Sequence, residues 1–244
     1  MTPSCTVVVP CFNEAQRLDL TQLDLLADAS AGRVLAVDDG STDATSELLA
    51  KLVDADRDRY QVLSLRGNRG KGEAVRLGLL EAIATGATLV AYCDADFATP
   101  PAEVARLIGA VRDDDGLDVA LGSRVALLGA DIRRSPVRHY AGRIFATVGS
   151  VVLGVPVYDT QCGAKAFRVT QELRAALARP FVSRWAFDVE LLGRLLQSPD
   201  YRRRCVELPL REWREPGGSK LTTWAGIGAA LDLVRIRAAL RDRG

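Results

Sequence analysis

The chain has 244 residues, with 32 lysines and arginines against 31 aspartates and glutamates, for a formal net charge of +1. This length allows one large α/β domain with a substantial core. The balanced charge argues against a nucleic-acid partner, because nucleic-acid-binding domains are typically strongly basic. The five cysteines form no C-x-x-C pair, so we expect buried thiols in a reducing compartment, not a zinc site or a disulfide framework.

The N-terminus runs directly into an apolar stretch without a basic start, and no window approaches 18 uninterrupted apolar residues. We therefore expect neither a secretory signal nor a membrane-spanning helix. The expected location is the cytoplasm, with peripheral attachment to the inner face of the cell membrane.

Short apolar runs rich in β-branched residues alternate with helix-like segments in the first half of the chain. Strands are expected at 5–10, 33–39, 61–65, 88–94 and 118–123, and helices at about 14–29, 42–56, 70–86 and 100–112. Ser41-Thr42-Asp43 is a candidate cap for the second helix, and Pro100-Pro101 suits the start of the fourth. This order predicts an α/β fold with a mostly parallel sheet flanked by helices on both faces.

Polar, small or acidic residues follow four of the five predicted strands. They are Pro10–Glu14, Asp38–Ser41, Asp94–Asp96 and Gly122–Arg124. Ligands bind at the carboxyl ends of the strands in such sheets, so we expect the functional site there.

Asp94 and Asp96 come directly after an apolar strand. If strand geometry continues past Cys93, the two carboxylates point to the same side, because side chains i and i+2 share a face. Carboxylate oxygens suit Mg²⁺ or Mn²⁺, whereas a solvated polar turn is the alternative interpretation. At the end of the predicted strand 33–39, Asp39 is typical of a turn and helix cap, which leaves Asp38 at the mouth of the site.

The regular alternation stops near residue 125. An amphipathic helix is expected at 141–153, followed by a strand-like run at 205–213 and a C-terminal helix from about 222. On the first of these helices one apolar stripe is predicted, made of Ala141, Ile144, Phe145, Val148 and Val152.

Several motifs occur in a fixed order along the chain: "VVVPCFNEAQRL", "VDDGSTDAT", "NRGKGEAVRLG", "DAD", "GSR", "DTQCGAKAFR", "RWAFDVELL" and "PGGSKL". Together they resemble the inverting family 2 glycosyltransferases of GT-A fold, specifically the dolichyl- or polyprenyl-phosphate sugar synthases. The resemblance covers residues 5–222, and the Q-C-G and R-W-x-F-D-V-E blocks are closer to the dolichyl-phosphate glucosyltransferase branch than to the mannosyl branch.

The resemblance implies a metal-dependent hexosyltransferase that takes glucose, or next mannose, from UDP-glucose or GDP-mannose and passes it to a polyprenyl phosphate. We expect one domain at 1–221, with a nucleotide-sugar half at 1–125 and an acceptor half at 126–221, followed by a C-terminal amphipathic helix at 222–244. The implied nucleotide-sugar contacts are Pro10, Asn13, Glu14, Asp38, Asp39, Lys71, Asp94, Asp159, Gln161, Arg184, Trp185 and Lys220. Asp94 and Asp96 would hold Mg²⁺ or Mn²⁺; Ala98 stands where some mannosyl relatives have an assisting glutamine.

Arg124 and Arg138 match family positions that bind the acceptor phosphate, a role that suits the planar, two-pronged guanidinium. Solvation of a helix entrance is the alternative for Arg138, and His139, the only histidine, is expected to be a surface residue. Gly217 and Gly218 beside Lys220 suggest a lid over the donor.

The acceptor decides whether the reaction needs a general base. A hydroxyl acceptor requires one, whereas a lipid monophosphate is largely dianionic at neutral pH. Asp188 is therefore either a catalytic base or a polar anchor of the sugar pocket, and Asp159 is equally ambiguous.

The C-terminal helix carries two apolar stripes on roughly opposite sides. One contains Ile227, Leu231, Val234 and Ala238, and the other contains Leu233, Ile236 and Leu240. One stripe can pack on the domain, which leaves the other for a membrane surface, a second copy of the chain or a membrane-protein partner.

Three rival functions remain. A family 2 transferase could act on a saccharide or small-molecule hydroxyl, a nucleotidyltransferase would make the activated sugar, and a non-catalytic protein would only bind it. The glycine-rich N-terminal loop of nucleotidyltransferases is missing from "VVVPCFNEAQ", and the intact D-x-D favours catalysis over binding alone.

Overall fold

The computed structural model describes residues 4–215 and 223–241, without the side chains of residues 136–139, 141 and 223–230. The strands are β1 (Cys5–Cys11), β2 (Arg33–Asp38), β3 (Tyr60–Ser64), β4 (Leu89–Cys93), β5 (Val119–Ser123), β6 (Asp131–Arg133), β7 (Ala164–Arg168), β8 (Cys205–Pro209) and β9 (Glu212–Arg214). The helices are α1 (Leu20–Ser30), α2 (Thr45–Ala55), α3 (Lys71–Ala84), α4 (Pro101–Asp113), α5 (Pro136–Leu153), α6 (Gln171–Leu177), α7 (Phe187–Leu195), α8 (Pro199–Arg202) and α9 (Thr223–Arg241).

Seven strands form one sheet in the order β3-β2-β1-β4-β7-β5-β8. All neighbouring pairs are parallel except those of β7, which runs antiparallel to both β4 and β5. Because β7 reverses the direction twice, β5 again points the same way as β4. The carboxyl ends of β1, β2, β4 and β5 therefore meet at one edge of the sheet, as predicted.

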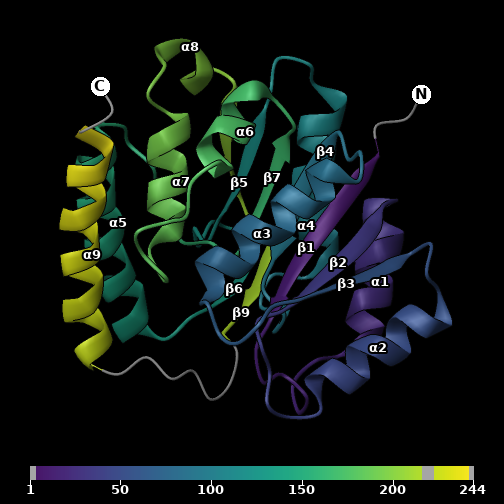
Figure 1. Cartoon of the computed structure of the whole chain (residues 1–244). Helices are drawn as coiled ribbons and strands as arrows, with labels where there is room; N and C mark the ends of the chain where they lie inside the picture. Colours follow the sequence, from purple (N-terminus) through teal and green to yellow (C-terminus); the bar gives the residue numbers. More distant parts are fainter. Residues whose placement is uncertain (1–3, 216–222, 242–244) are drawn as a thin grey trace.

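Helices cover both faces of this sheet (Figure 1). Along β1, Val7 and Val9 belong to the core beneath α1, α2 and α4, while Val8 belongs to the core beneath α3, α6 and α7. Every second residue points to the opposite face, so a strand buried on both sides is a continuous apolar run. This confirms the predicted mostly parallel α/β fold.

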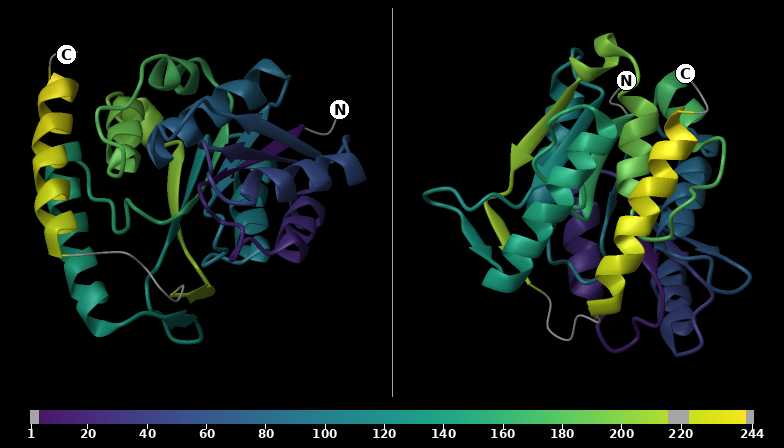
Figure 2. Two further views of the ribbon diagram at one scale, coloured as in Figure 1. Left: turned by 60° about the horizontal axis from the view of Figure 1, so that its bottom comes forward. Right: turned by 90° about the vertical axis from the view of Figure 1, so that its left-hand side faces the viewer.

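Helices α5 and α9 lie side by side as an outer layer beyond α7 (Figure 2). On α9, Leu233 and Ile236 are buried and Leu240 packs against the core, whereas Leu231 and Val234 are exposed. One predicted stripe thus packs on the domain and the other remains exposed; Ile227 lies outside the described side chains. Among the described residues, no helix has both the length and the hydropathy needed to cross a bilayer.

The prediction that the apolar residues of α5 form one stripe on a single face was wrong. Phe145 and Val152 pack against the core, but Ile144 and Val148 are exposed. Packing against α7 and α9 selects a face rotated from the predicted one.

The predicted helix 14–29 begins later, at Leu20, where the Asp19 side chain accepts the Thr21 N–H at 2.9 Å as an N-cap. The second helix likewise begins at Thr45 and not at residue 42. The Glu14 and Ala15 N–H groups, which the prediction placed in the first helix, instead donate to Thr45 Oγ1 at 2.8 Å and to Asp43 Oδ2 at 3.2 Å. The strand-like run 205–213 is two strands, β8 and β9, in different sheets.

Candidate active site

The loop after β1 is fastened to the loop after β2 by side-chain hydrogen bonds. Asn13, with φ of 53°, accepts the Thr42 N–H at 2.8 Å through Oδ1 and donates its own N–H to Ser41 Oγ at 3.1 Å. The Glu14 N–H donates to Thr45 Oγ1 at 2.8 Å. The sequence motifs around Asn13 and Thr42 therefore form one structural unit at the carboxyl edge of the sheet.

Asp38 and Asp39 are buried at the end of β2, at 3% and 2% exposure. Asp38 accepts the Ser41 N–H at 2.9 Å and the Ser46 hydroxyl. Asp39 accepts two backbone N–H groups, from Arg69 at 2.7 Å and Gly70 at 2.8 Å. Both carboxylates thus hold the surrounding loops by accepting hydrogen bonds from uncharged groups, and Asp39 fixes the chain just before α3.

Asp94 and Asp96 reach the site from a turn, because β4 ends at Cys93. The Phe97 N–H donates to the Asp94 carbonyl at 3.1 Å, and Phe97 has a φ of 49°. The prediction of continued strand geometry was therefore wrong, although the two side chains remain close enough to interact. Burial raises the pKa of Asp96, and the Asp94 carboxylate raises it further.

Lys71 is the first residue of α3, and its Nζ lies 2.6 Å from Asp94 Oδ1. Burial would lower the pKa of Lys71, but the carboxylates of Asp94 and Asp188 outweigh burial and raise it. Lys71 thus links the end of β4 to the start of α7.

The glycines that flank Lys71 allow a close approach of the segment before α7. A Cβ on Gly70, which has a φ of 95°, would lie 2.5 Å from Arg184 Nε. A Cβ on Gly72 would lie 2.7 Å from Phe187 Cβ. The Arg184 guanidinium in turn donates to Asn68 Oδ1, so the "NRGKG" and "RWAF" motifs interlock.

Arg124, just past β5, forms a two-pronged ion pair with Asp159. Its Nε donates to Oδ2 at 2.7 Å and one Nη to Oδ1 at 2.8 Å. Burial opposes both charges, but Arg124 lowers the pKa of Asp159 to about 2, and Asp159 raises that of Arg124. The same Nη also donates to the Gln161 carbonyl at 3.1 Å, and no described residue accepts from the other.

Asp188, in the first turn of α7, is also paired with a buried cation. Its Oδ1 accepts from Lys165 Nζ at 2.7 Å and from the Tyr92 hydroxyl. Lys165 is fully buried and Asp188 is 4% exposed. Burial and the Asp188 carboxylate raise the pKa of Tyr92 well above its usual value, so the phenol stays protonated and keeps donating.

The remaining predicted residues border this edge to different degrees. Gln161 Nε2 donates to the Trp185 carbonyl at 3.4 Å, and the Trp185 side chain is 69% exposed. Pro10 is half-buried at the end of β1, and Glu14 pairs with Arg17 at 2.6 Å. Two predicted residues lie outside what the structure describes: the side chain of Arg138, and Lys220 together with the suggested lid.

Sequence reasoning missed three residues of this site: Lys165, Tyr92 and Gly163. A Cβ on Gly163 would lie 2.2 Å from Asp94 Oδ2, so only glycine lets the chain before β7 pass this carboxylate. Lys165 stands in the otherwise apolar run "AKAF", and a lone lysine inside a buried strand was the available signal.

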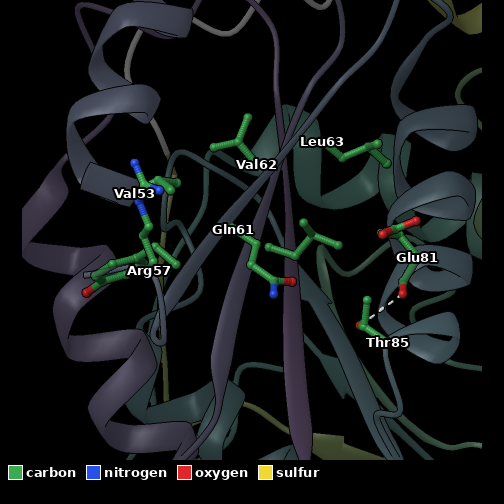
Figure 3. A pocket seen from close by; sticks show the side chains of 9 residues that line it. Val53, Arg57, Gln61, Val62, Leu63, Glu81 and Thr85 are labelled. Atoms are coloured by element: carbon green, nitrogen blue, oxygen red, sulfur yellow. Dashed lines mark hydrogen bonds between the residues drawn. The ribbon is translucent and has the colours of Figure 1, made fainter. Parts of the chain in front are cut away.

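One hollow in the described structure lies elsewhere. It measures about 320 Å³ and lies between the ends of α2 and α3 beside the edge strand β3, with Gln61 and Thr85 among its lining residues (Figure 3). These positions belong to the amino-terminal end of β3 and the carboxyl end of α3. The hollow is therefore at the opposite edge of the sheet from the carboxylates.

Residues 6–172 match the family model described as "Glycosyl transferase family 2". The chain belongs to glycosyl transferase family 2. As a family 2 member it is a hexosyltransferase with a GT-A fold. It is 37% identical to the dolichyl-phosphate beta-glucosyltransferase of Drosophila melanogaster, covering 95% of this chain and 74% of that protein. It is 30% identical to the polyprenol monophosphomannose synthase of Mycolicibacterium smegmatis, covering 91% of this chain and 82% of that protein.

Two solved structures of sugar-phosphoglycerate synthases share the fold of this chain. Mannosyl-3-phosphoglycerate synthase from Rubrobacter xylanophilus matches with a TM-score of 0.72 and 19% identity, covering 99% of this chain and 75% of that chain. Glucosyl-3-phosphoglycerate synthase from Mycobacterium tuberculosis, in complex with Mn²⁺, UDP and its product, matches with a TM-score of 0.62 and 19% identity, covering 98% and 80%.

Proposed function

We propose that this family 2 enzyme transfers a hexose, glucose first and mannose next, from a nucleotide sugar to a polyprenyl or dolichyl phosphate with inversion. The names of the two relatives support this class of acceptor, since one is a dolichyl-phosphate glucosyltransferase and the other a polyprenol phosphomannose synthase. Four of the site's motifs meet at one edge of the sheet, where parallel α/β folds bind ligands.

The state of Asp188 is the observation that carries the choice of acceptor. A base must present a free carboxylate oxygen to the acceptor proton. Asp188 is buried, and one of its two carboxylate oxygens, Oδ1, is bound to Lys165 and Tyr92, which leaves only Oδ2 for an acceptor proton. A lipid phosphate, with a second pKa of about 6 by analogy with phosphorylated side chains, needs no deprotonation at neutral pH. The pairing of Asp188 therefore favours a phosphate acceptor over a hydroxyl.

Arginines suit the acceptor phosphate. The Arg124 guanidinium is held in a fixed orientation by Asp159, and one Nη has no described acceptor. A guanidinium fixed in this way can present its remaining N–H groups to a phosphate oxygen. Arg138 is proposed as the second phosphate contact on the family resemblance alone.

The residues present fit a divalent cation at Asp94 and Asp96. Asp94 Oδ1 is buried, and its one described polar partner is the Lys71 ammonium at 2.6 Å, so this oxygen already binds a cation. Mg²⁺ and Mn²⁺ typically take one or two carboxylates and leave their other positions to water and phosphate. A bound cation would neutralise the charge that grows on the leaving diphosphate. Gly163 lets the chain pass without displacing Asp94.

For the donor, we propose that the loops held by Asn13, Asp38 and Asp39 form the nucleotide pocket. Asp39 orders the backbone before Lys71, whose ammonium supplies positive charge for the diphosphate. Trp185 offers an exposed aromatic face beside the site for the sugar ring or the lipid.

The outer layer of α5 and α9 suits attachment to an anionic membrane surface. Exposed apolar side chains lie on both helices: Tyr140, Ile144, Val148 and Val151 on α5, and Leu231 and Val234 on α9. The two helices together contain five arginines and one acidic residue, although the whole chain is nearly neutral. Apolar stripes beside excess positive charge are typical of helices that lie in the membrane interface.

Vesicle flotation tests this membrane face. We expect the wild type to float with anionic vesicles, and the Ile144→Asp/Val234→Asp variant to remain in the soluble fraction. Leu25→Asp on α1 is the matched control, because Leu25 is an exposed apolar residue on another helix. Absence of flotation of the wild type would contradict membrane attachment. A dimer in solution that only the double variant dissociates would assign this face to a second copy of the chain.

Matched acceptors test the function itself. The full chain would be incubated with UDP-glucose or GDP-mannose and Mn²⁺, together with either a polyprenyl phosphate or the corresponding polyprenol. We expect transfer only to the phosphate, with a β-linked product by NMR from the α-linked donor. Transfer to the polyprenol or to a saccharide hydroxyl, with the phosphate left unused, would instead support a hydroxyl acceptor.

A further inference from the structure

Lys71 is placed where a helix normally avoids a cation. It is the first residue of α3, and the N-terminus of a helix carries partial positive charge. No side chain caps this end: Gly70 is the N-cap residue, with a φ of 95°. Local helix stability therefore does not explain a lysine at this position, and its partner outside the helix must do so.

That partner is Asp94. The Lys71 Nζ lies 2.6 Å from Asp94 Oδ1, with both side chains about 30% exposed, at 28% and 31%. This oxygen accepts no other hydrogen bond from the described residues. Lys71 is therefore the described cation that compensates this carboxylate oxygen, which is the atom proposed above as a metal ligand.

We propose that the Lys71 ammonium acts as a resident substitute for the metal, so that Lys71 and the divalent cation compete for Asp94. The inference rests on the proposed metal site at Asp94 and Asp96. One carboxylate oxygen cannot keep an ammonium at 2.6 Å and also bind a metal ion in the same direction. Metal binding therefore displaces Lys71 from Asp94.

A second carboxylate acts on the Lys71 ammonium. Asp188 attracts it through its charge, and the Lys71 Nζ lies 6.0 Å from the centre of the Phe187 ring at the start of α7. When the nucleotide is present, its diphosphate oxygens offer a further partner. The metal and the nucleotide thus favour each other, because the metal releases Lys71 and the diphosphate accepts it.

This exchange makes metal binding depend on the nucleotide. Without nucleotide, the cation must separate an existing ion pair, so its affinity is low. With nucleotide, the separated ammonium is paired again, and the affinity rises. Such coupling is reciprocal, so the metal raises the nucleotide affinity by the same factor, which in proteins is typically about 5- to 150-fold.

Removal of the ammonium tests the competition directly. Binding of Mn²⁺ to the full chain would be measured from the EPR signal of free Mn²⁺, without nucleotide and with UDP or GDP. We expect Lys71→Met to bind Mn²⁺ alone at least about tenfold more tightly than the wild type, and to gain less affinity from the nucleotide. Lys71→Gln serves as a second variant, with thermal unfolding as the check that both fold.

Lys51→Met is the matched control, since it removes one exposed lysine from α2 and changes the net charge equally. It should leave Mn²⁺ affinity unchanged. The inference is overturned if the wild type binds Mn²⁺ through Asp94 with nucleotide, yet Lys71→Met binds Mn²⁺ alone no more tightly than the wild type. A different result, in which no protein binds Mn²⁺ in an Asp94-dependent way even with nucleotide, would overturn the metal site itself.

Discussion

The two sides of the active-site edge hold their buried carboxylates by different means. On the side of β2, Asp39 accepts two backbone N–H groups. On the side of β5 and α7, Asp159 is bound by the Arg124 guanidinium and Asp188 by the Lys165 ammonium. Backbone dipoles carry no net charge, so they provide Asp39 with no compensating cation. The second side neutralises its acids with side-chain cations from within the chain.

This difference assigns separate roles to the two sides. The acids of the second side are already compensated, so they serve to fix Arg124 and α7 in place. The acids on the side of β2 have no such side-chain cation among the described residues and attract positive charge. Asp94 and Asp96, which lie at the end of β4 between the two sides, also attract positive charge. A divalent cation therefore suits the junction at β4, where Asp94 has only Lys71 as its described compensating charge.

The largest expected effect comes from breaking a buried ion pair on the second side. Lys165→Met leaves the Asp188 carboxylate buried without its cation, and we expect a loss of about 3–5 kcal/mol in unfolding free energy. Urea denaturation at neutral pH measures this loss. Combining Lys165→Met with Asp188→Leu should recover much of it, because no uncompensated charge remains. A loss below about 1 kcal/mol for Lys165→Met would contradict the assigned role.

A smaller, pH-dependent effect is expected from Asp159. Its pKa is lowered from 3.8 to about 2, which corresponds to about 2 kcal/mol of stability. A lowered pKa means that this stability is complete above about pH 5 and is lost as the pH falls from about 4 to about 2.

Arg124→Gln removes the cause of that shift. Urea denaturation at pH 7, 4 and 3 should show the stability difference between wild type and variant shrinking as the pH falls. A difference that stays constant over this range would mean that Asp159 and Arg124 are not coupled through charge.

The smallest expected effect is on the side of β2, where backbone N–H groups hold the carboxylate of Asp39. Asp39→Asn keeps one acceptor oxygen for the N–H groups of Arg69 and Gly70, and no cation is left unpaired. We expect a loss of about 1 kcal/mol in unfolding free energy. A loss as large as that of Lys165→Met would remove the distinction between the two sides.

The five strands of the first half of the chain and the edge that carries the site were predictable, because β-branched runs and polar strand ends are local features of the sequence. The position of β7, antiparallel between β4 and β5, was not predicted. It depends on tertiary contacts between segments that are far apart in the sequence. The turn at Asp94 also escaped prediction, because Phe97 adopts a positive φ that its side chain does not signal. The pairing of Asp188 with Lys165 could not be read from residues 23 positions apart.

The proposed metal site is tested most directly by nucleotide affinity. Isothermal titration calorimetry would measure binding of UDP and GDP to the wild type and to Asp94→Asn/Asp96→Asn, with and without Mn²⁺. We expect Mn²⁺ to tighten binding of the preferred nucleotide to the wild type at least about fivefold, and to have no effect on the variant. Equal nucleotide affinity of the wild type with and without Mn²⁺ would contradict a metal held by Asp94 and Asp96.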